Sequence, residues 1–269
     1  MSTREEWILS QVAPTKEELY AGDGCHLDEA ICLIDYLNNN ITAQQAATAI
    51  TKPVLQEADP QDQLFRLMAL LCEAPVELPA DRDKLYDLLF AIQALPPEAG
   101  INWVDLPGFA SMWTDLLRLG VYGTNTWKEE SLSGDRKTEL RQRYKAVGTV
   151  EAELYLRNLG GVSDVWAYET INQVCSWRPG LDIVITGIHA WLKVAGSKLM
   201  ADMKPEHIQT FSSGRRGNWV RKHAMVDTMA GFWDHWRSTF MQLSKDEEYL
   251  SAESRRLAAE CHDLMQKGT

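Results

Sequence analysis

Hydrophobic residues dominate one long segment of the chain, Leu181–Met200. With 3.6 residues per turn, this segment is apolar over most of its circumference and polar along one narrow stripe. The stripe consists of Asp182, Thr186, His189, Lys193 and Ser197. A helix with so thin a polar stripe is enclosed by other helices, so we expect Leu181–Met200 to be central. The β-branched run Ile183–Thr186 would also suit a strand, but the length of the apolar pattern favours a helix.

Helix-start signals and helical periodicity recur along the rest of the chain. The pairs Thr3/Glu6 and Thr42/Gln45 have capping-box spacing, in which two side chains satisfy free backbone amides at a helix start. No segment alternates as a half-buried strand would. The sequence therefore predicts an all-α fold, a single multi-helix orthogonal bundle of about ten helices around Leu181–Met200. Its last part comprises helices over Arg136–Asn158, Ser163–Trp177, Leu181–Met200, Asn218–Ser244 and Ser251–Lys267.

The domain organisation depends on the segment Gly120–Asp135. This segment contains three glycines and an asparagine, residues typical of loops. It is the best candidate for a boundary, because no low-complexity linker or internal repeat occurs elsewhere in the sequence. We expect one domain over residues 1–269, with two lobes, 1–120 and 136–269, as the alternative.

Composition and charge exclude several classes of protein. The chain has 27 basic and 38 acidic residues, a net charge of −11, which argues against nucleic acid as a partner because phosphate binding needs a basic face. No uncharged apolar run reaches about 18 residues, so we expect no membrane span. The five cysteines form no CxxC pair, and the first residues carry no apolar signal segment. We expect a cytoplasmic protein with reduced thiols.

Glu151 is a candidate catalytic residue because of its position within an apolar helix face. On the predicted helix Arg136–Asn158 it lies among Tyr144, Val147 and Leu154, with Tyr155 beside it. A carboxylate among apolar groups is costly unless it is paired or protonated, and such a group can act as a general acid or base. The alternative interpretation is a structural ion pair.

His189 is the second candidate, because it lies in the middle of the polar stripe. It stands between Asp182 and Lys193 and one helical turn from Thr186. If this stripe lines a pocket, His189 can transfer protons near neutral pH. The alternative is that the stripe simply faces water.

Aromatic residues supply candidate walls for a ligand pocket. Trp233 lies on the apolar face of the predicted helix Asn218–Ser244, where aromatic side chains form either a core or a binding wall. The predicted ligand-binding residues are Tyr144, Tyr155, Asp182, Thr186, Trp191 and Trp233.

Metal and cofactor motifs are weak or missing. His223, Asp227 and Asp234 share one helix shoulder but have the pattern of a solvated face. Ser212–Gly217 combines glycines and arginines before a helix, yet it lacks the phosphate-loop lysine pattern. The adjacent aspartates of terpene cyclases, GxSxG, HExxH and GxGxxG are absent. We therefore predict no metal and no cofactor.

Three segments carry a resemblance to a known family. They are Tyr36–Ala47, Trp103–Pro107, and Phe232–Trp236 followed by Glu253–Met265. Their order and spacing resemble an uncharacterised family of all-helical proteins of filamentous fungi. The resemblance implies a helical fold, a cytosolic setting and a connection with secondary metabolism. It implies no catalytic residues.

Two functions fit these patterns. The first is the binding of a hydrophobic small molecule in an apolar, aromatic pocket, with cofactor-independent cyclase or isomerase chemistry by Glu151 and His189. The second is an interaction or scaffold protein without catalytic activity, because tryptophans serve cores and protein interfaces equally well. A closed apolar cavity containing a buried carboxylate would favour the first.

Overall fold

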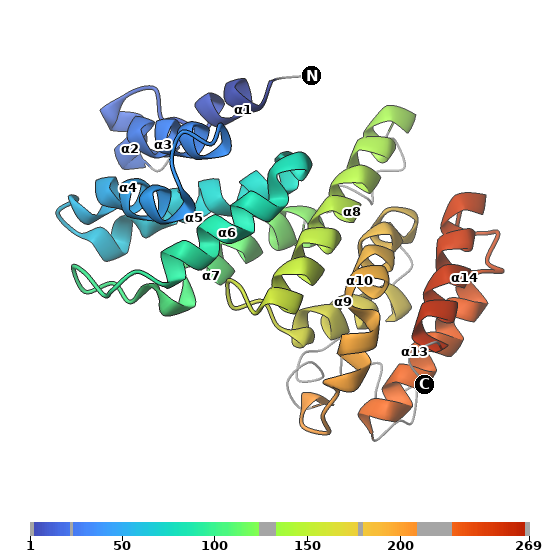
Figure 1. Ribbon diagram of the computed structural model, residues 1–269. Coiled ribbons are helices and arrows are strands. Elements are labelled where there is room, and N and C mark those ends of the chain that lie inside the picture. Colours follow the sequence, from blue (N-terminus) through green and yellow to red (C-terminus); the bar gives the residue numbers. More distant parts are fainter. Residues whose placement is uncertain (1–2, 22–23, 124–132, 177–179, 209–227, 267–269) are drawn as a thin grey trace. The chain divides into compact units, whose positions relative to one another are not determined.

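The computed structural model describes residues 3–21, 24–123, 133–176, 180–208 and 228–266. The structure is 76% helical (Figure 1), and its described residues form twelve α-helices and no strand beyond two isolated bridges. The predicted all-α bundle is confirmed. None of the helices within these ranges is long and apolar enough to cross a membrane.

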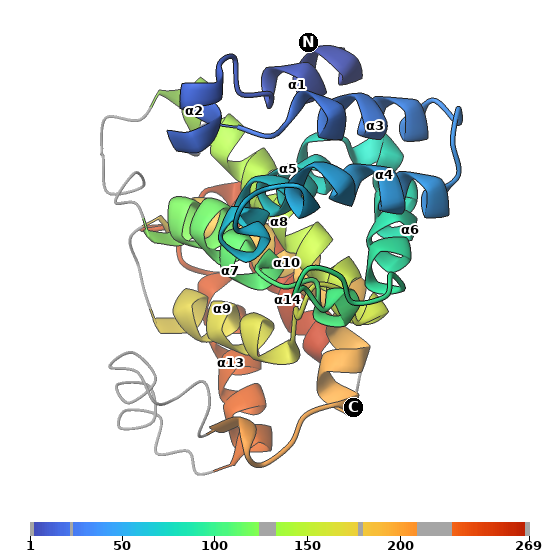
Figure 2. The ribbon, with the colours of Figure 1, turned by 90° about the vertical axis from the view of Figure 1, so that its left-hand side faces the viewer.

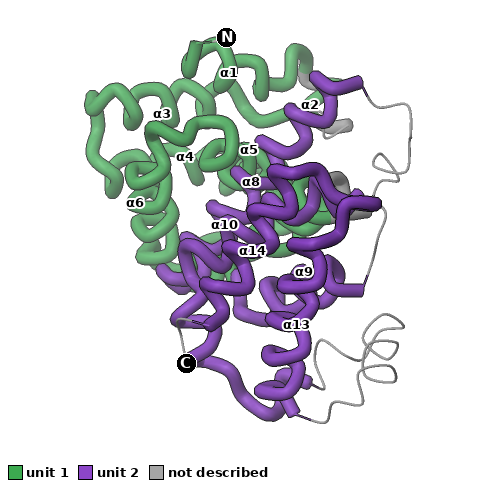
Figure 3. The backbone as a smooth tube through the Cα atoms, turned by 90° about the vertical axis from the view of Figure 1, so that its right-hand side faces the viewer, with its two compact units in different colours: residues 1–121, 159–161 green, residues 122–158, 162–269 purple. Residues whose placement is uncertain are grey.

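Residue contacts divide the chain into two compact units (Figure 3). Unit 1 comprises Met1–Val121 with Leu159–Gly161, and unit 2 comprises Tyr122–Asn158 with Val162–Thr269. The first boundary falls beside residue 120, where the first predicted lobe ends. That the whole chain forms a single domain stays a prediction.

Unit 1 contains helices that begin at the predicted start signals. Thr3 and Thr42 both form the expected capping boxes, and Asp59 accepts a hydrogen bond at the start of the helix that follows it. In Figure 2, α3 and α4 run side by side, and α4 also contacts α6 while α5 contacts α7. The helices are α1 (Arg4–Ser10), α2 (Lys16–Ala21), α3 (Leu27–Leu37), α4 (Ala43–Leu55), α5 (Pro60–Glu77), α6 (Arg82–Gln93) and α7 (Phe109–Trp113), with the 3₁₀ helices η1 (Pro79–Asp81) and η2 (Trp103–Asp105).

A carboxyl group lies in the core of unit 1. Glu29 of α3 is fully buried, and its Oε2 accepts a hydrogen bond of 2.9 Å from the backbone amide of His26. Burial raises the pKa of Glu29 to about 8, although this hydrogen bond and the charge of Arg66 act in the opposite direction. Folding therefore changes the protonation of this group near neutral pH.

Unit 2 is built around the helix that the sequence predicted to be central. Helix α10 (Leu181–Ala201) contacts α8, α9 and α14, and most of its side chains are buried. The run Ile183–Thr186 is helical, so the strand alternative was wrong. The other helices are α8 (Gly134–Arg157), α9 (Asp164–Ser176), α13 (Met229–Leu243) and α14 (Ala252–Gln266), and α13 packs against α14.

Helices α8 and α10 meet at two glycines. A Cβ atom on Gly148 would lie 2.3 Å from the carbonyl oxygen of Gly187, so the two backbones touch and leave no room for a side chain. Contacts between the two helices follow the same order along both of them. Arg141 contacts Asp182 near their starts, and Tyr155 contacts Asp202 near their ends. The two helices therefore run in the same direction.

The predicted loop Gly120–Asp135 is helical at both ends. A π-helix, η3 (Thr114–Gly123), includes its first residues, and α8 begins at Gly134. Residues 124–132 lie outside the described ranges. The same holds for residues 218–227 of the predicted helix Asn218–Ser244, of which the structure shows α13 from Met229.

Candidate functional site

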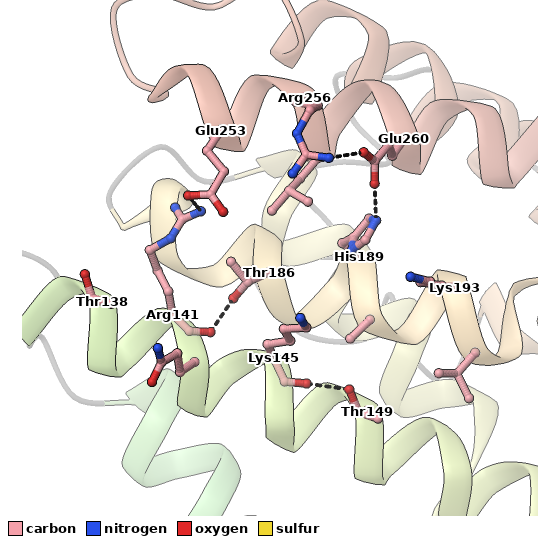
Figure 4. A pocket seen from close by; sticks show the side chains of 14 residues that line it. Thr138, Arg141, Lys145, Thr149, Thr186, His189, Lys193, Glu253, Arg256 and Glu260 are labelled. Carbon is pink, nitrogen blue, oxygen red and sulfur yellow. Dashed lines mark hydrogen bonds and ion pairs between the residues drawn. The ribbon is translucent and has the colours of Figure 1, made fainter.

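A cleft of about 740 Å³ lies in unit 2, between α8, α10 and α14 (Figure 4). Most of its lining residues are polar or charged, three are small or aliphatic, and none is Phe, Tyr or Trp. It therefore differs from the apolar, aromatic pocket that the sequence predicted. The lining residues are Thr138, Arg141, Gln142, Lys145 and Thr149 of α8, Thr186, His189, Ala190, Lys193 and Val194 of α10, and Glu253, Arg256, Leu257 and Glu260 of α14.

The polar stripe of α10 forms one wall of this cleft. Thr186, His189 and Lys193 all line it, because spacings of three and four place side chains on the same side of a helix. The Thr186 hydroxyl lies 3.0 Å from the carbonyl oxygen of Arg141 and 2.7 Å from that of Ile183. The stripe thus faces α8 and α14 across the cleft, and the Thr186 hydroxyl is occupied by backbone acceptors.

Arg141 joins the three helices at one end of the cleft. Its guanidinium lies 2.9 Å from Glu253 Oε2 and 3.5 Å from Asp182 Oδ2, and it donates a hydrogen bond of 2.7 Å to Ser254 Oγ. Asp182 in turn accepts hydrogen bonds from the backbone amide and hydroxyl of Ser251, just before α14. Arg141 and Asp182 therefore hold the start of α14 in place.

The protonation of Asp182 agrees with this structural role. Burial by itself would raise the pKa of Asp182. The hydrogen bonds from Ser251 and Ser254 and the charge of Arg141 outweigh burial, so the pKa is below its ordinary value. Asp182 is therefore an anion at neutral pH, bound by protein groups rather than directed toward a ligand.

His189 is oriented by α14. Its Nε2 lies 2.8 Å from Glu260 Oε2, and Arg256 contacts the other oxygen of Glu260 at 2.6 Å. Burial lowers the pKa of His189, and the charges of Lys193 and Lys145 lower it further against the opposing effect of Glu260. His189 is therefore neutral at pH 7, and because a carboxylate can only accept, Nε2 carries the proton.

Lys145 and Lys193 direct their ammonium groups into the cleft below His189 (Figure 4). Neither lysine forms an ion pair with an acidic residue in the described part of the chain, whereas Arg141 and Arg256 both do. The lining holds four cationic side chains and two acidic ones, so its cations exceed its acids by two. The cleft is consequently a local positive region in a strongly acidic chain.

Glu151 lies elsewhere in unit 2. It is fully buried, and its Oε2 accepts a hydrogen bond of 2.7 Å from Trp191 Nε1. The centroids of the Trp191 ring on α10 and the Tyr155 ring on α8 lie 5.8 Å apart. Glu151 does not line the cleft that His189 lines, so the structure does not bring the two predicted catalytic residues into one pocket.

The predicted aromatic ligand-binding residues belong to the packed interior. Tyr144, Tyr155, Trp191 and Trp233 are all buried, and none of them lines the cleft. The Tyr155 hydroxyl donates to Asp202 at 2.6 Å, and Trp233 Nε1 donates to the carbonyl oxygen of Met265 at 3.2 Å. These side chains have protein partners for their polar ends, which suits a core.

Sequence reasoning missed Lys145, Arg141 and Glu260. Lys145 and Arg141 are four residues apart on the polar face of α8. That this face lines a cleft depends on the packing of α8 with α10 and α14, which the sequence does not show. Of the possible metal ligands, His223 and Asp227 lie outside the described ranges, as does Ser212–Gly217. Among the residues that the structure does describe, no group of three His, Cys, Asp or Glu side chains has metal-binding geometry.

Comparison with known proteins gives no relative for this chain. No family model, curated protein or solved structure matches it, so the resemblance to an all-helical fungal family stays a prediction and the site stands on its own geometry.

Proposed function

We propose that unit 2 binds a small organic anion in the cleft between α8, α10 and α14. The observation that carries the proposal is the pair Lys145 and Lys193, two cations that face the cleft beside a neutral His189 and form no ion pair with a described acidic residue. Ammonium groups held near one another repel, and an anion placed between them removes that repulsion.

The shape and lining of the cleft also suit a small organic ligand. Its volume of about 740 Å³ lies within the range of small-molecule pockets. Ala190, Val194 and Leu257 provide an apolar side for the body of the ligand, and the lysines provide the charged side. An anion with a compact hydrocarbon or ring portion would contact both the apolar side and the charged side of the cleft.

This proposal keeps part of the function predicted from the sequence and changes the rest. The ligand remains a small molecule, but its binding group is anionic instead of hydrophobic. If the protein is a cofactor-independent cyclase or isomerase of fungal secondary metabolism, His189 is the predicted acid–base residue within reach of the ligand, because Glu151 does not line the cleft. The alternative of an interaction protein without catalytic activity stays a prediction.

Isothermal titration with benzenedisulfonate, an aromatic dianion without a titratable group near neutral pH, tests the proposal. We expect saturable binding of one equivalent, and weaker binding by Lys145→Gln and Lys193→Gln. Lys137→Gln is the matched control, because it removes the same charge from an exposed position of α8 outside the cleft. Absence of binding to the wild-type protein, or equal weakening by the control, would overturn the proposal.

A further inference from the structure

We propose that the cleft takes a dianionic ligand together with a proton, and that this proton goes to Nδ1 of His189. The inference rests on the proposed function and adds the charge class of the ligand and its regulation by pH. The excess of two cations in the cleft lining matches two negative charges on the ligand.

The geometry leaves one nitrogen of His189 for the proton. Nε2 is held by Glu260 at 2.8 Å, so proton uptake occurs at Nδ1. No hydrogen bond joins Nδ1 to a protein group in the part of the chain that the structure describes. A protonated His189 would donate from Nε2 to Glu260 and from Nδ1 to a further acceptor. An anionic ligand in the cleft is such an acceptor.

Burial is the main cause that holds His189 neutral while the cleft contains no anion, and two neighbouring lysines add to it. Lys145 of α8 and Lys193 of α10 both disfavour an imidazolium. Glu260 of α14 favours it, but Glu260 also binds Arg256, so its charge is shared between two partners. The remaining charged group of the lining on α8, Arg141, is paired with Glu253 and with Asp182. A dianion bound beside the lysines would offset their positive charges and so favour the protonated form of His189.

Proton uptake and anion binding are then thermodynamically linked. A ligand that raises the pKa of His189 binds its protonated form more tightly, and the coupling is reciprocal. Between the pKa values of the free and the bound protein, affinity should fall by up to about tenfold per pH unit as pH rises. The cleft would thus load an anion at mildly acid pH and release it at alkaline pH.

Benzenedisulfonate titrations of the full chain from about pH 5.5 to about pH 8.5 test this inference. We expect at least about a tenfold loss of affinity over that range, and no such loss in His189→Gln, which cannot take up the proton. His235→Gln is the matched control, because His235 of α13 is also partly buried but does not line the cleft. It should keep the pH dependence of the wild type.

A second readout does not depend on the folding of a variant. Nuclear magnetic resonance of the wild-type imidazoles should show a higher midpoint for His189 with benzenedisulfonate than without it. Binding that is independent of pH, or an unchanged His189 midpoint, would overturn the inference and leave the proposed function standing. No binding at any pH would instead overturn the proposed function itself.

Discussion

The two units each contain a cleft, and the two clefts differ in charge far more than in size. The cleft of unit 1 has a volume of about 670 Å³, close to the 740 Å³ of unit 2. Asp62, Asp105 and Asp115 line it, and its lining residues include no Lys, Arg or His. The cleft of unit 2 instead has two lysines and two arginines against two glutamates.

This difference shows that the volume of a cleft does not decide what it binds. Both clefts have room for a small molecule, but a negative ligand meets repulsion in unit 1 and attraction in unit 2. The comparison also distinguishes charges held by the protein from charges left for a ligand. Arg141 binds Asp182 and Glu253, while Lys145 and Lys193 have no such partners among the described residues.

A large effect on stability should come from the contact of Gly148 with Gly187, which joins α8 and α10, two of the helices that line the unit 2 cleft. In Gly148→Ala the new Cβ would lie 2.3 Å from the Gly187 carbonyl oxygen, so α8 and α10 must separate. We expect a loss of roughly 3 kcal/mol in the free energy of unfolding, measured with urea. Gly134→Ala, where a Cβ meets nothing within 4 Å, should cause no loss. Equal stability of both variants would show that the helices are not in contact there.

The next effect concerns the pH dependence of the stability of unit 1. It comes from a carboxyl group in the core of this unit and not from its cleft. The folded pKa of Glu29 is about 8 against an ordinary value of 4.5, so the unfolded chain releases this proton first. The contribution of Glu29 to stability is therefore full below about pH 4.5 and is lost as pH rises through about 8, a change of up to several kcal/mol.

Glu29→Gln should remove this pH dependence, because its amide oxygen still accepts the hydrogen bond from His26 without carrying a charge. Urea denaturation at mildly acid and at alkaline pH measures the change. The neighbouring exposed Asp28, changed to Asn, is the control and should leave the pH dependence in place. A wild-type protein equally stable at both pH values would contradict the assignment.

Removing both cleft lysines should affect binding and leave stability almost unchanged. We expect each ammonium group to contribute about tenfold to the affinity for a dianion, so Lys145→Gln with Lys193→Gln should weaken benzenedisulfonate binding by about a hundredfold. Both side chains are exposed, so the free energy of unfolding should change by less than about 0.5 kcal/mol. Titration and denaturation of the same preparation separate the two effects. A large loss of stability would mean that the lysines support the fold.

The smallest effect should come from the acidic cleft of unit 1. Changing Asp62, Asp105 and Asp115 to Asn removes three negative charges from this cleft and adds no positive charge. Benzenedisulfonate affinity should stay within about twofold of the wild type, because none of these aspartates lines the cleft of unit 2 and exposed charges are screened by salt. An increase of tenfold or more in titration would mean that the two clefts are not independent.

Much of the fold could be predicted from local signals. The bounds of α10 and α14 differ from the predicted helices by one residue at one or both ends, because periodicity and caps are local properties of the sequence. The site was harder to predict. His189 and Glu260 are 71 positions apart, and Glu151 and Trp191 are 40 apart, and no local pattern specifies such pairs.

Glu151 illustrates this limit best. Its burial followed from the helical face on which it lies, and the structure places it in the core. Its partner, the Trp191 indole, comes from another helix, and that contact gives the carboxylate a structural hydrogen bond. For His189 the polar stripe left open whether it lines a pocket or faces water, and it included Lys193 but not Lys145, which comes from α8.

Methyl resonances can compare the two clefts in one experiment. Val194 and Leu257 line the cleft of unit 2, and Ile101 and Met112 line the cleft of unit 1. If the cleft of unit 2 is the anion site, benzenedisulfonate should shift the methyl signals of Val194 and Leu257 in a saturable manner and leave those of Ile101 and Met112 in place. Shifts confined to unit 1, or equal shifts in both clefts, would contradict the account.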